Sequence, residues 1–379
     1  MNRSDIIMSR KVITLGTANL FKKIIILCLT GSLSIFLLSC TINYSNADTK
    51  ASRSESSPSV KDTSITLNEI DQLKSASLND ISSIIVDSTS TNISIQTHNK
   101  KEFEAHLYGK SVSKIEFELK RVGNTLNIYI NTPDPITGEM FKATILNGIP
   151  LYDLKLDFLI PDEYKNDISI SSGTGSIDIA SSLKLKNITL NSETGDIVSL
   201  KSIDSQGFEV KNSTGAISLE NVNCKNGSAK LTTGLIKCKK MFSKDYIDFE
   251  ASSGNMILDS INCKAMLIDS SSGDVTLVNP KGDVSIKSLC GNTDLTYSHY
   301  ASNKITINSI TGNVCLKLPY SSSFKLDTKT TTGDIKCNFQ LKSISSNDKH
   351  SLCGTVDNGK SPIVLSTSSG NISILKINH

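Results

Sequence analysis

The sequence has few of the side chains that usually grip a ligand in a deep site. Tryptophan is absent, aromatic residues make up 5% of the chain, and there are only four arginines, none of them after Arg121. Aromatic platforms and planar guanidinium groups are common devices for binding sugars, bases, phosphates and carboxylates. Their scarcity argues against a dedicated deep binding site in the long stretch that follows Arg121.

Charge excess and catalytic motifs are also missing. The chain carries 40 basic and 37 acidic residues, a net charge of +3, which gives no signal for nucleic acid. It contains no GxSxG, P-loop or HExxH motif, and its histidines are scattered: His98, His106, His299, His350 and His379. We therefore predict a protein that is not an enzyme and has no cofactor, no metal site, no catalytic residue and no nucleic-acid partner.

A short phrase repeats through most of the sequence instead. It consists of small polar residues, a glycine, another small residue and then alternating apolar residues, as in SGTGSIDI and TTGDIKC. Successive glycines lie 18 to 21 residues apart, with one longer gap of 37 before the last. The repeat glycines are Gly175, Gly195, Gly215, Gly234, Gly254, Gly273, Gly291, Gly312, Gly333 and Gly370. A fixed period of this length is typical of solenoids and other repeat arrays.

The alternation predicts strands on both sides of each glycine. Apolar residues recur two and four places after it, as in Val275 and Leu277, and seven and five places before it, as in Ile188 and Leu190. A period of two indicates a strand with one buried face, and glycine suits a turn that needs positive φ. We predict an all-β, elongated β-solenoid or β-helix-like stack of about ten 20-residue Gly-turn repeats, with a capping β-layer at its N-terminal end. A meander of stacked hairpins is the competing arrangement, because it places the same residues inward.

The first residues have the features of an export signal. Lys22 and Lys23 precede the apolar run 24–38, which is too short to span a bilayer comfortably and ends in Leu37-Leu38-Ser39-Cys40. This ending resembles a bacterial lipobox, which implies that residues 1–39 are a lipoprotein signal peptide and that Cys40 is lipidated. An uncleaved signal anchor is the alternative.

The remaining chain divides by composition into a tether, a β-layer and the repeats. Residues 40–80 comprise the lipidated cysteine and a flexible tether rich in Ser, Thr and Lys. Within them, residues 65–80 are expected to form a short helix or to continue the linker. Residues 81–165 form the N-terminal β-layer, and residues 166–379 form the repeat solenoid. The strands expected in the layer are residues 83–87, 92–97, 103–108, 114–120, 125–130 and 154–160, with a loop at 132–150.

Four segments carry a family resemblance. They are SSIIVDSTSTNISI, GNTLNIYI, IPDEYKND and ISISSGTGSIDI, which follow one another from residue 82 to residue 179. This pattern, over residues 81–377, resembles the bacterial putative-adhesin family of β-strand repeat proteins. The resemblance implies a surface or membrane-linked β-repeat protein, and some relatives are linked to envelope-stress systems. It implies no catalytic residues.

Three further groups could carry chemistry. Seven cysteines follow Cys40, namely Cys224, Cys238, Cys263, Cys290, Cys315, Cys337 and Cys353. Several occupy inward repeat positions, so we expect buried thiols, with one or two disulfides as the alternative.

Acidic residues follow turn glycines at Asp196, Asp274, Asp283 and Asp334, where turn chemistry is favoured over a row of calcium ligands. The cluster Tyr297-Ser298-His299-Tyr300 is interpreted as a loop, with a binding spot as the alternative.

Together these features predict an exported lipoprotein, lipid-anchored at the outer face of the cell membrane, that displays a β-solenoid for adhesion or surface interaction. Its partners would be the membrane, through the lipid, and components of the cell wall, the envelope or a host surface. A regulatory protein that senses envelope stress is the second hypothesis. A polysaccharide-active β-helix enzyme is the third, and it would need paired carboxylates in neighbouring coils.

Overall fold

The structure is a computed structural model that describes residues 67–132 and 152–377. Its regular elements are all strands, and these residues contain no helix. The described part of the chain therefore has no helix that is long and apolar enough to cross a bilayer. Every strand lies within one compact unit, Thr63–His379. The predicted signal peptide, Cys40 and most of the loop at 132–150 fall outside the described residues.

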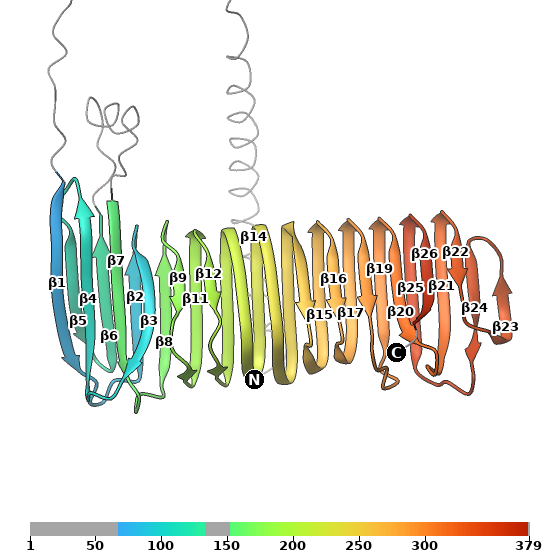
Figure 1. Cartoon of the computed structure of the whole chain (residues 1–379), viewed down its shortest axis with the longest axis horizontal. Coiled ribbons are helices and arrows are strands. Elements are labelled where there is room, and N and C mark those ends of the chain that lie inside the picture. The colour runs from blue at the N-terminus through green and yellow to red at the C-terminus, as the bar shows by residue number, and fades with distance from the viewer. Residues whose placement is uncertain (1–66, 133–151, 378–379) are drawn as a thin grey trace, which may run out of the picture. The chain divides into compact units, whose positions relative to one another are not determined.

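Each repeat is one coil, with a strand before the turn glycine and a strand after it (Figure 1). The strands before the glycines form the pre-glycine face: β8 (Asp167–Ser172), β11 (Asn187–Thr194), β15 (Asn262–Ser272), β17 (Lys281–Cys290), β19 (Ile305–Thr311), β21 (Phe324–Thr332) and β25 (Pro362–Ser369). Those after them form the post-glycine face: β9 (Ile177–Ile179), β12 (Ile197–Ser199), β16 (Val275–Val278), β18 (Thr293–Thr296), β20 (Val314–Pro319), β22 (Ile335–Cys337) and β26 (Ile372–Ile377). Short strands β10 (Leu183–Lys184) and β13 (Ile203–Asp204) link two of the coils, and the 53-residue β14 (Gly207–Asp259) runs through both faces.

Parallel pairing between successive coils distinguishes the solenoid from a hairpin meander. On the post-glycine face Ile197 pairs with both Ile177 and Ile217 in parallel register. On the pre-glycine face Ile188 pairs in the same way with Ile168 and Phe208. Hairpins would require antiparallel pairs between neighbouring strands of the repeats. The prediction of an all-β, solenoid-like fold is confirmed, with the strands joined in one open sheet.

The predicted alternation also defines the core. Ile177, Ile197 and Ile217 are fully buried, as are Ile188 and Leu190 on the opposite face. Identical registers place these side chains in columns along the interior of the stack. Each fully buried aliphatic side chain contributes about 1.5–3 kcal/mol relative to an exposed one. The columns supply the stabilisation that a single coil could not reach by itself.

The six strands expected between residues 81 and 165 are all present. They are β2 (Ser83–Ser88), β3 (Asn92–His98), β4 (Glu102–Ser111), β5 (Glu116–Val122), β6 (Thr125–Asn131) and β7 (Tyr152–Pro161). Their order in space differs from their order in sequence, because β2 lies between β6 and β8, and β3 between β7 and β9, all in parallel register. This layer therefore contributes two coils to the stack.

The expectation of a helix or linker at residues 65–80 is wrong for most of that stretch. Residues Asn68–Ser77 form strand β1, which pairs antiparallel with β4 along its whole length. The segment has helix-compatible spacing, but β4 offers a free edge, and alternate β1 residues such as Ile70 and Ala76 pack against the core. Tertiary pairing overrides a weak local preference here. The tether predicted for residues 40–80 therefore ends before Asn68.

The C-terminal end mirrors the N-terminal one. The last coil in sequence, β25 and β26, lies between the coil of β19 and β20 and the coil of β21 and β22. The long gap before Gly370 is filled by the antiparallel hairpin of β23 (Lys342–Asn347) and β24 (Ser351–Val356), which pairs with β21. Both ends of the stack thus close with antiparallel strands, and the outer strand β5 carries exposed charges such as Glu118 and Lys120. Charged outer strands discourage pairing with other chains.

The ten turn glycines lie where the two faces meet. A Cβ added to Gly234 would lie 1.9 Å from the carbonyl oxygen of Gly215, and one added to Gly312 would lie 2.0 Å from that of Gly291. All except Gly175 and Gly254 have positive φ, which was the reason predicted for glycine here. Those two also approach the backbone of the neighbouring coil closely. Close approach of successive coils is therefore the requirement that all ten share.

We predict that Gly234→Ala lowers the free energy of unfolding by at least about 2 kcal/mol, because it combines an unfavourable φ of +137° with a backbone clash. Urea unfolding followed by circular dichroism measures the change. The exposed neighbour Thr233→Ala is the matched control and should stay within about 0.5 kcal/mol of the unchanged protein. Equal stability of the two variants would contradict this account.

Candidate functional site

The residues that follow the turn glycines form a ladder of side-chain hydrogen bonds. The amide of Ala216 donates to Asp196 Oδ1 (2.7 Å), that of Asn292 to Asp274 Oδ1 (2.8 Å), and that of Asp334 to Asn371 Oδ1 (2.8 Å). Each side chain thus accepts a bond from the turn of the neighbouring coil. These contacts support the turn role predicted for Asp196 and Asp274. In the described part of the chain no group of three or more His, Cys, Asp or Glu residues is placed to hold a metal.

The other acidic residues singled out have separate contacts. Asp283 Oδ1 accepts the amide of Lys304 at 3.0 Å, outside the glycine ladder. Asp334 lies 3.6 Å from Lys349 Nζ at the C-terminal end of the stack. Asp196, Asp274 and Asp334 share the ladder position, but non-acidic residues such as Ala216 and Asn292 separate them, so they do not form the unbroken row of carboxylates that a calcium ladder would require.

The cysteines occupy several different environments. Cys224, Cys238 and Cys263 are buried, Cys315, Cys337 and Cys353 are half-buried, and Cys290 is exposed; all seven are free thiols. Burial raises the pKa of Cys224 to about 11 and that of Cys238 and of Cys263 to about 12. These three thiols are therefore neutral and unreactive near neutral pH, as expected for apolar core residues.

The tyrosine cluster belongs mainly to the core. Tyr297 is fully buried and meets the ring of Tyr300 edge-on, with ring centroids 5.4 Å apart. The hydroxyl of Tyr300 donates to the carbonyl oxygen of Asn303 at 2.6 Å. Ser298 and His299 are exposed, whereas both tyrosines are buried. The cluster therefore stabilises a connection between coils and presents two polar side chains, but no tyrosine ring, to solvent.

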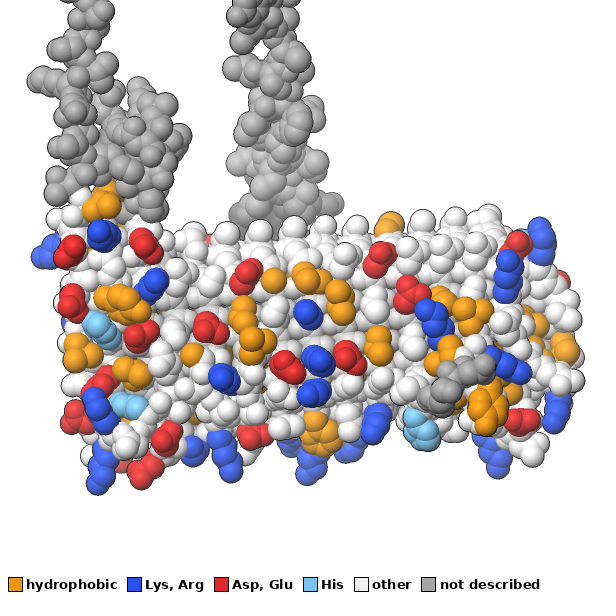
Figure 2. All heavy atoms as spheres, in the orientation of Figure 1, with side chains coloured by type: hydrophobic (Ala, Val, Ile, Leu, Met, Phe, Trp, Pro, Cys, Tyr) orange, Lys and Arg blue, Asp and Glu red, His pale blue; other side chains and the backbone are white. Residues whose placement is uncertain are grey.

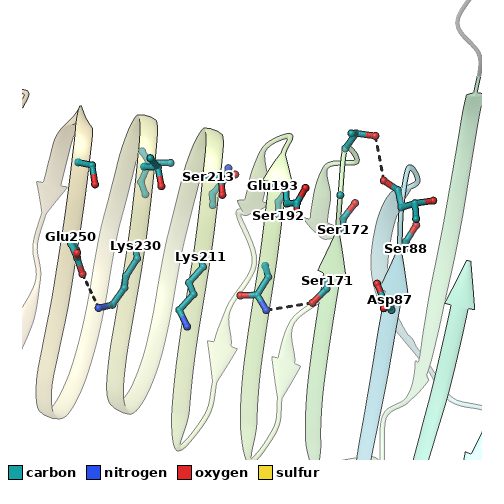
Figure 3. Close-up of a pocket in the computed structure, with 18 residues that line it drawn as sticks. Asp87, Ser88, Ser171, Ser172, Ser192, Glu193, Lys211, Ser213, Lys230 and Glu250 are labelled. Carbon is teal, nitrogen blue, oxygen red and sulfur yellow. Dashed lines mark hydrogen bonds and ion pairs between the residues drawn. The ribbon is translucent and has the colours of Figure 1, made fainter. Parts of the chain in front are cut away.

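The main surface hollow lies on the pre-glycine face, where the sequence predicted no site. Three adjoining depressions of about 680, 350 and 570 Å³ together form what we call the trough. Its centre follows a straight row of residues four places before successive glycines: Ser171, Asn191, Lys211, Lys230 and Glu250. Figure 3 shows the lysines and Glu250 of this row projecting from consecutive coils. The row follows directly from the repeat, because parallel pairing places the equivalent residue of each coil at the same position along its strand.

The row continues toward the N-terminal end through strand pairing. Asp87 lies opposite Ser171, Tyr129 opposite Asp87, and Glu118 opposite Tyr129. Tyr129 is 41% exposed at this end of the trough, and Tyr246, 49% exposed, lines the other side. Among the described residues that line the trough, these two are the exposed aromatic side chains, since Phe208 is buried.

The trough is acidic although the chain as a whole is slightly basic. Its lining contains seven carboxylates and two lysines; the carboxylates are Asp87, Glu116, Glu118, Glu193, Glu209, Asp248 and Glu250. Both lysines are already paired, Lys211 with Glu209 (2.5 Å) and Lys230 with Glu250 (2.8 Å). The hydrogen bond from Lys230 to Glu250 raises the pKa of Lys230. Asp87, Glu118 and Glu193 make no ion pair with any residue that the structure describes, so their charge is available to a ligand.

Comparison with protein families identifies a family that covers the repeat region. The family model described as Toastrack DUF4097 matches residues 81–375, more than three quarters of the chain. This range begins just before β2 and ends within β26, so it includes all the turn glycines. A search of curated proteins finds no match.

Two solved structures also match. One is a presumed cell adhesion protein of Clostridium sporogenes, with 11% identity and a TM-score of 0.23, covering 82% of this chain and 100% of the other. The second is a presumed adhesin of Bacteroides fragilis, with 11% identity and a TM-score of 0.32, covering 82% of this chain and 98% of the other.

The thiol environments predict an ordered reactivity. At pH 8, iodoacetamide should alkylate exposed Cys290 first, whereas Cys224, Cys238 and Cys263 should react only after unfolding, because their raised pKa values keep the thiolate scarce. Peptide mass mapping after timed labelling measures the order, and Cys290→Ser should abolish the fast phase. Rapid labelling of Cys238 in the folded protein would contradict the structure.

Proposed function

The chain belongs to the Toastrack DUF4097 family, and on that premise we propose that it is a non-enzymatic adhesion lipoprotein of the cell envelope. The proposal places it outside the cell, anchored by a lipid at Cys40, with the β-solenoid as the adhesive part. The apolar run, the lipobox-like ending and the polar stretch up to β1 support export and anchoring. The trough on the pre-glycine face supports adhesion.

The trough has the form expected of a surface for many weak contacts. Hydroxyl, amide and charged side chains recur at every coil, so a ligand lying along the stack meets a similar contact about every 4.8 Å. The hollows are open depressions, and the groups that line them are individually weak binders. Affinity would come from the number of contacts made at once.

The excess of carboxylates indicates the charge of the ligand. Seven carboxylates against two paired lysines leave a negative field along the trough. An extended, positively charged segment on the partner surface is complementary to that field. Charge complementarity of this kind controls specificity and the rate of encounter more than the final affinity. The trough is the single observation on which this part of the proposal depends.

Removing charge from the trough should weaken binding to a cationic polymer. We predict that Asp87→Asn, Glu118→Gln and Glu193→Gln together reduce affinity for surface-bound polylysine about tenfold, since three exposed contacts of about 0.5 kcal/mol each are lost. Binding by the unchanged protein should fall steeply as salt is raised. Surface plasmon resonance measures both effects.

The matched control removes three carboxylates from outside the trough: Asp162→Asn, Asp204→Asn and Asp357→Asn. It has the same net charge as the trough variant and should bind polylysine nearly as well as the unchanged protein. Equal losses in the two variants would show that only net charge matters and would exclude the trough as the adhesive surface.

The anchoring part of the proposal has its own test. Metabolic labelling with a fatty acid should mark the full chain, and globomycin, which blocks lipoprotein signal cleavage, should cause the precursor to accumulate. Cys40→Ala should abolish the label while leaving the solenoid intact, because the sequence of the described strands, which begin at Asn68, is unchanged. Labelling that persists in Cys40→Ala would disprove lipidation at this position.

A further inference from the structure

Lysines concentrate along one long edge of the stack. We call the lysine edge the set of connections that lead from the post-glycine face of one coil to the pre-glycine face of the next: residues 180–186, 200–206, 220–227, 239–246, 259–265, 279–283, 297–304 and 320–323. These connections contain five acidic residues and ten lysines. The lysines, all exposed, are Lys184, Lys186, Lys201, Lys225, Lys239, Lys240, Lys244, Lys264, Lys281 and Lys304. In Figure 2 basic side chains protrude along the lower edge of the molecule.

The glycine edge, on the other side of the stack, has the opposite character. Its turns are residues 173–176, 193–196, 213–216, 232–235, 252–255, 271–274, 289–292, 310–313, 331–334 and 368–371, and they contain no lysine or arginine. They contain four carboxylates, Glu193, Asp196, Asp274 and Asp334. The small net charge of the chain therefore conceals a separation of charge between two edges, which creates a field across the stack.

Most lysines on the lysine edge are uncompensated. Lys264 pairs with Asp245 at 2.8 Å, and Lys240 approaches Glu220 at 3.9 Å. The other eight make no ion pair with any residue in the described ranges. Internal neutralisation therefore does not explain the clustering, and the charges are free to meet an external anionic surface.

Exposed apolar side chains lie on the same edge. Leu200 is 66% exposed, Phe242 45% and Tyr320 67%, and each belongs to one of the connections that define the lysine edge. Leu200 is followed by Lys201, and Phe242 lies between Lys240 and Lys244 in sequence. A purely electrostatic surface for a soluble polyanion has no need of such residues. Lysines interspersed with Phe, Tyr and Leu are characteristic of protein surfaces that lie at a bilayer interface.

We propose that the lysine edge docks on the surface of an anionic lipid bilayer, with the lysines at the headgroups and Leu200, Phe242 and Tyr320 entering the interface. Each lysine near a negatively charged leaflet adds a favourable electrostatic contribution to the free energy of binding. Apolar side chains that enter the interface add a hydrophobic contribution that salt does not screen. The stack would lie along the bilayer with the glycine edge turned away from it. This inference goes beyond the adhesive function and requires neither the lipid at Cys40 nor the trough.

Residues 63–379 form a compact unit that contains every described strand. Binding of this unit to lipid vesicles tests the proposal in the absence of the N-terminal segment. The unit should sediment with vesicles of phosphatidylglycerol and phosphatidylcholine, and much less with phosphatidylcholine alone. Lys239→Gln, Lys240→Gln and Lys244→Gln together should weaken partitioning at least about tenfold. Lys287→Gln, Lys329→Gln and Lys336→Gln, with the same change in net charge on the two faces, should have little effect. Equal weakening in both triple variants would overturn the proposal.

Because the chain has no tryptophan, a single introduced one reports directly on the interface. The fluorescence of Phe242→Trp should shift to the blue when anionic vesicles are added, whereas that of Leu289→Trp on the glycine edge should not. Leu200→Ser with Phe242→Ser should weaken vesicle binding severalfold, unlike the control pair Leu289→Ser with Ile310→Ser, which is similarly exposed. An unshifted Phe242→Trp spectrum, together with tight binding of soluble polyphosphate, would assign the edge to an anionic polymer and exclude the bilayer.

Discussion

The structure depends on how closely one coil can approach the next at the turn. At the point where the two faces meet, a backbone carbonyl oxygen of the neighbouring coil occupies the position that a Cβ on the turn glycine would need, as the carbonyl oxygen of Gly215 does for Gly234 and that of Thr91 does for Gly175. This contact allows parallel pairing to continue on both faces without a break. The side-chain ladder then fastens the turns, for example through Asp274 and Asn292. The core columns follow from this register, because equal coils bring equal positions into line.

A stack of equal coils has two open ends, and the chain closes both in the same way. At the N-terminal end the coil of β2 and β3 lies inside the coil of β6 and β7, and at the C-terminal end the coil of β25 and β26 lies inside the coil of β21 and β22. The outermost coil at each end also pairs with an antiparallel strand, β4 at one end and β24 at the other. Lys74 of β1 lies over the ring of Phe117 with its ammonium 5.0 Å from the ring centre, which joins the two outer strands of the N-terminal end. The inserted coils are therefore paired on both sides, and at the C-terminal end the short strand β22, which pairs with β26 alone, is the outermost strand of the post-glycine face.

Regular coils also determine where function can arise. Equivalent outward positions of successive coils line up in a straight row. The residue types along that row therefore set the charge and polarity of the surface from one coil to the next. The trough and the lysine edge are two such surfaces of opposite charge, which meet at Asn226, Gly227 and Tyr246. If the lysine edge meets a bilayer, the trough on the pre-glycine face stays accessible from the side. One surface would then position the protein while another contacts its partner.

The sequence by itself determined the repeat strands, the turn glycines and the inward positions of Cys238 and Cys337, because these follow from a period of two and from the small space at the turn. It did not determine strand β1, whose structure depends on the free edge of β4, or the internal placement of β25 and β26, since pairing partners far apart in sequence decide both. The trough and the lysine edge were also out of reach. Local composition near Lys211 or Lys240 is ordinary, and only the superposition of coils gathers residues about 20 positions apart into one surface.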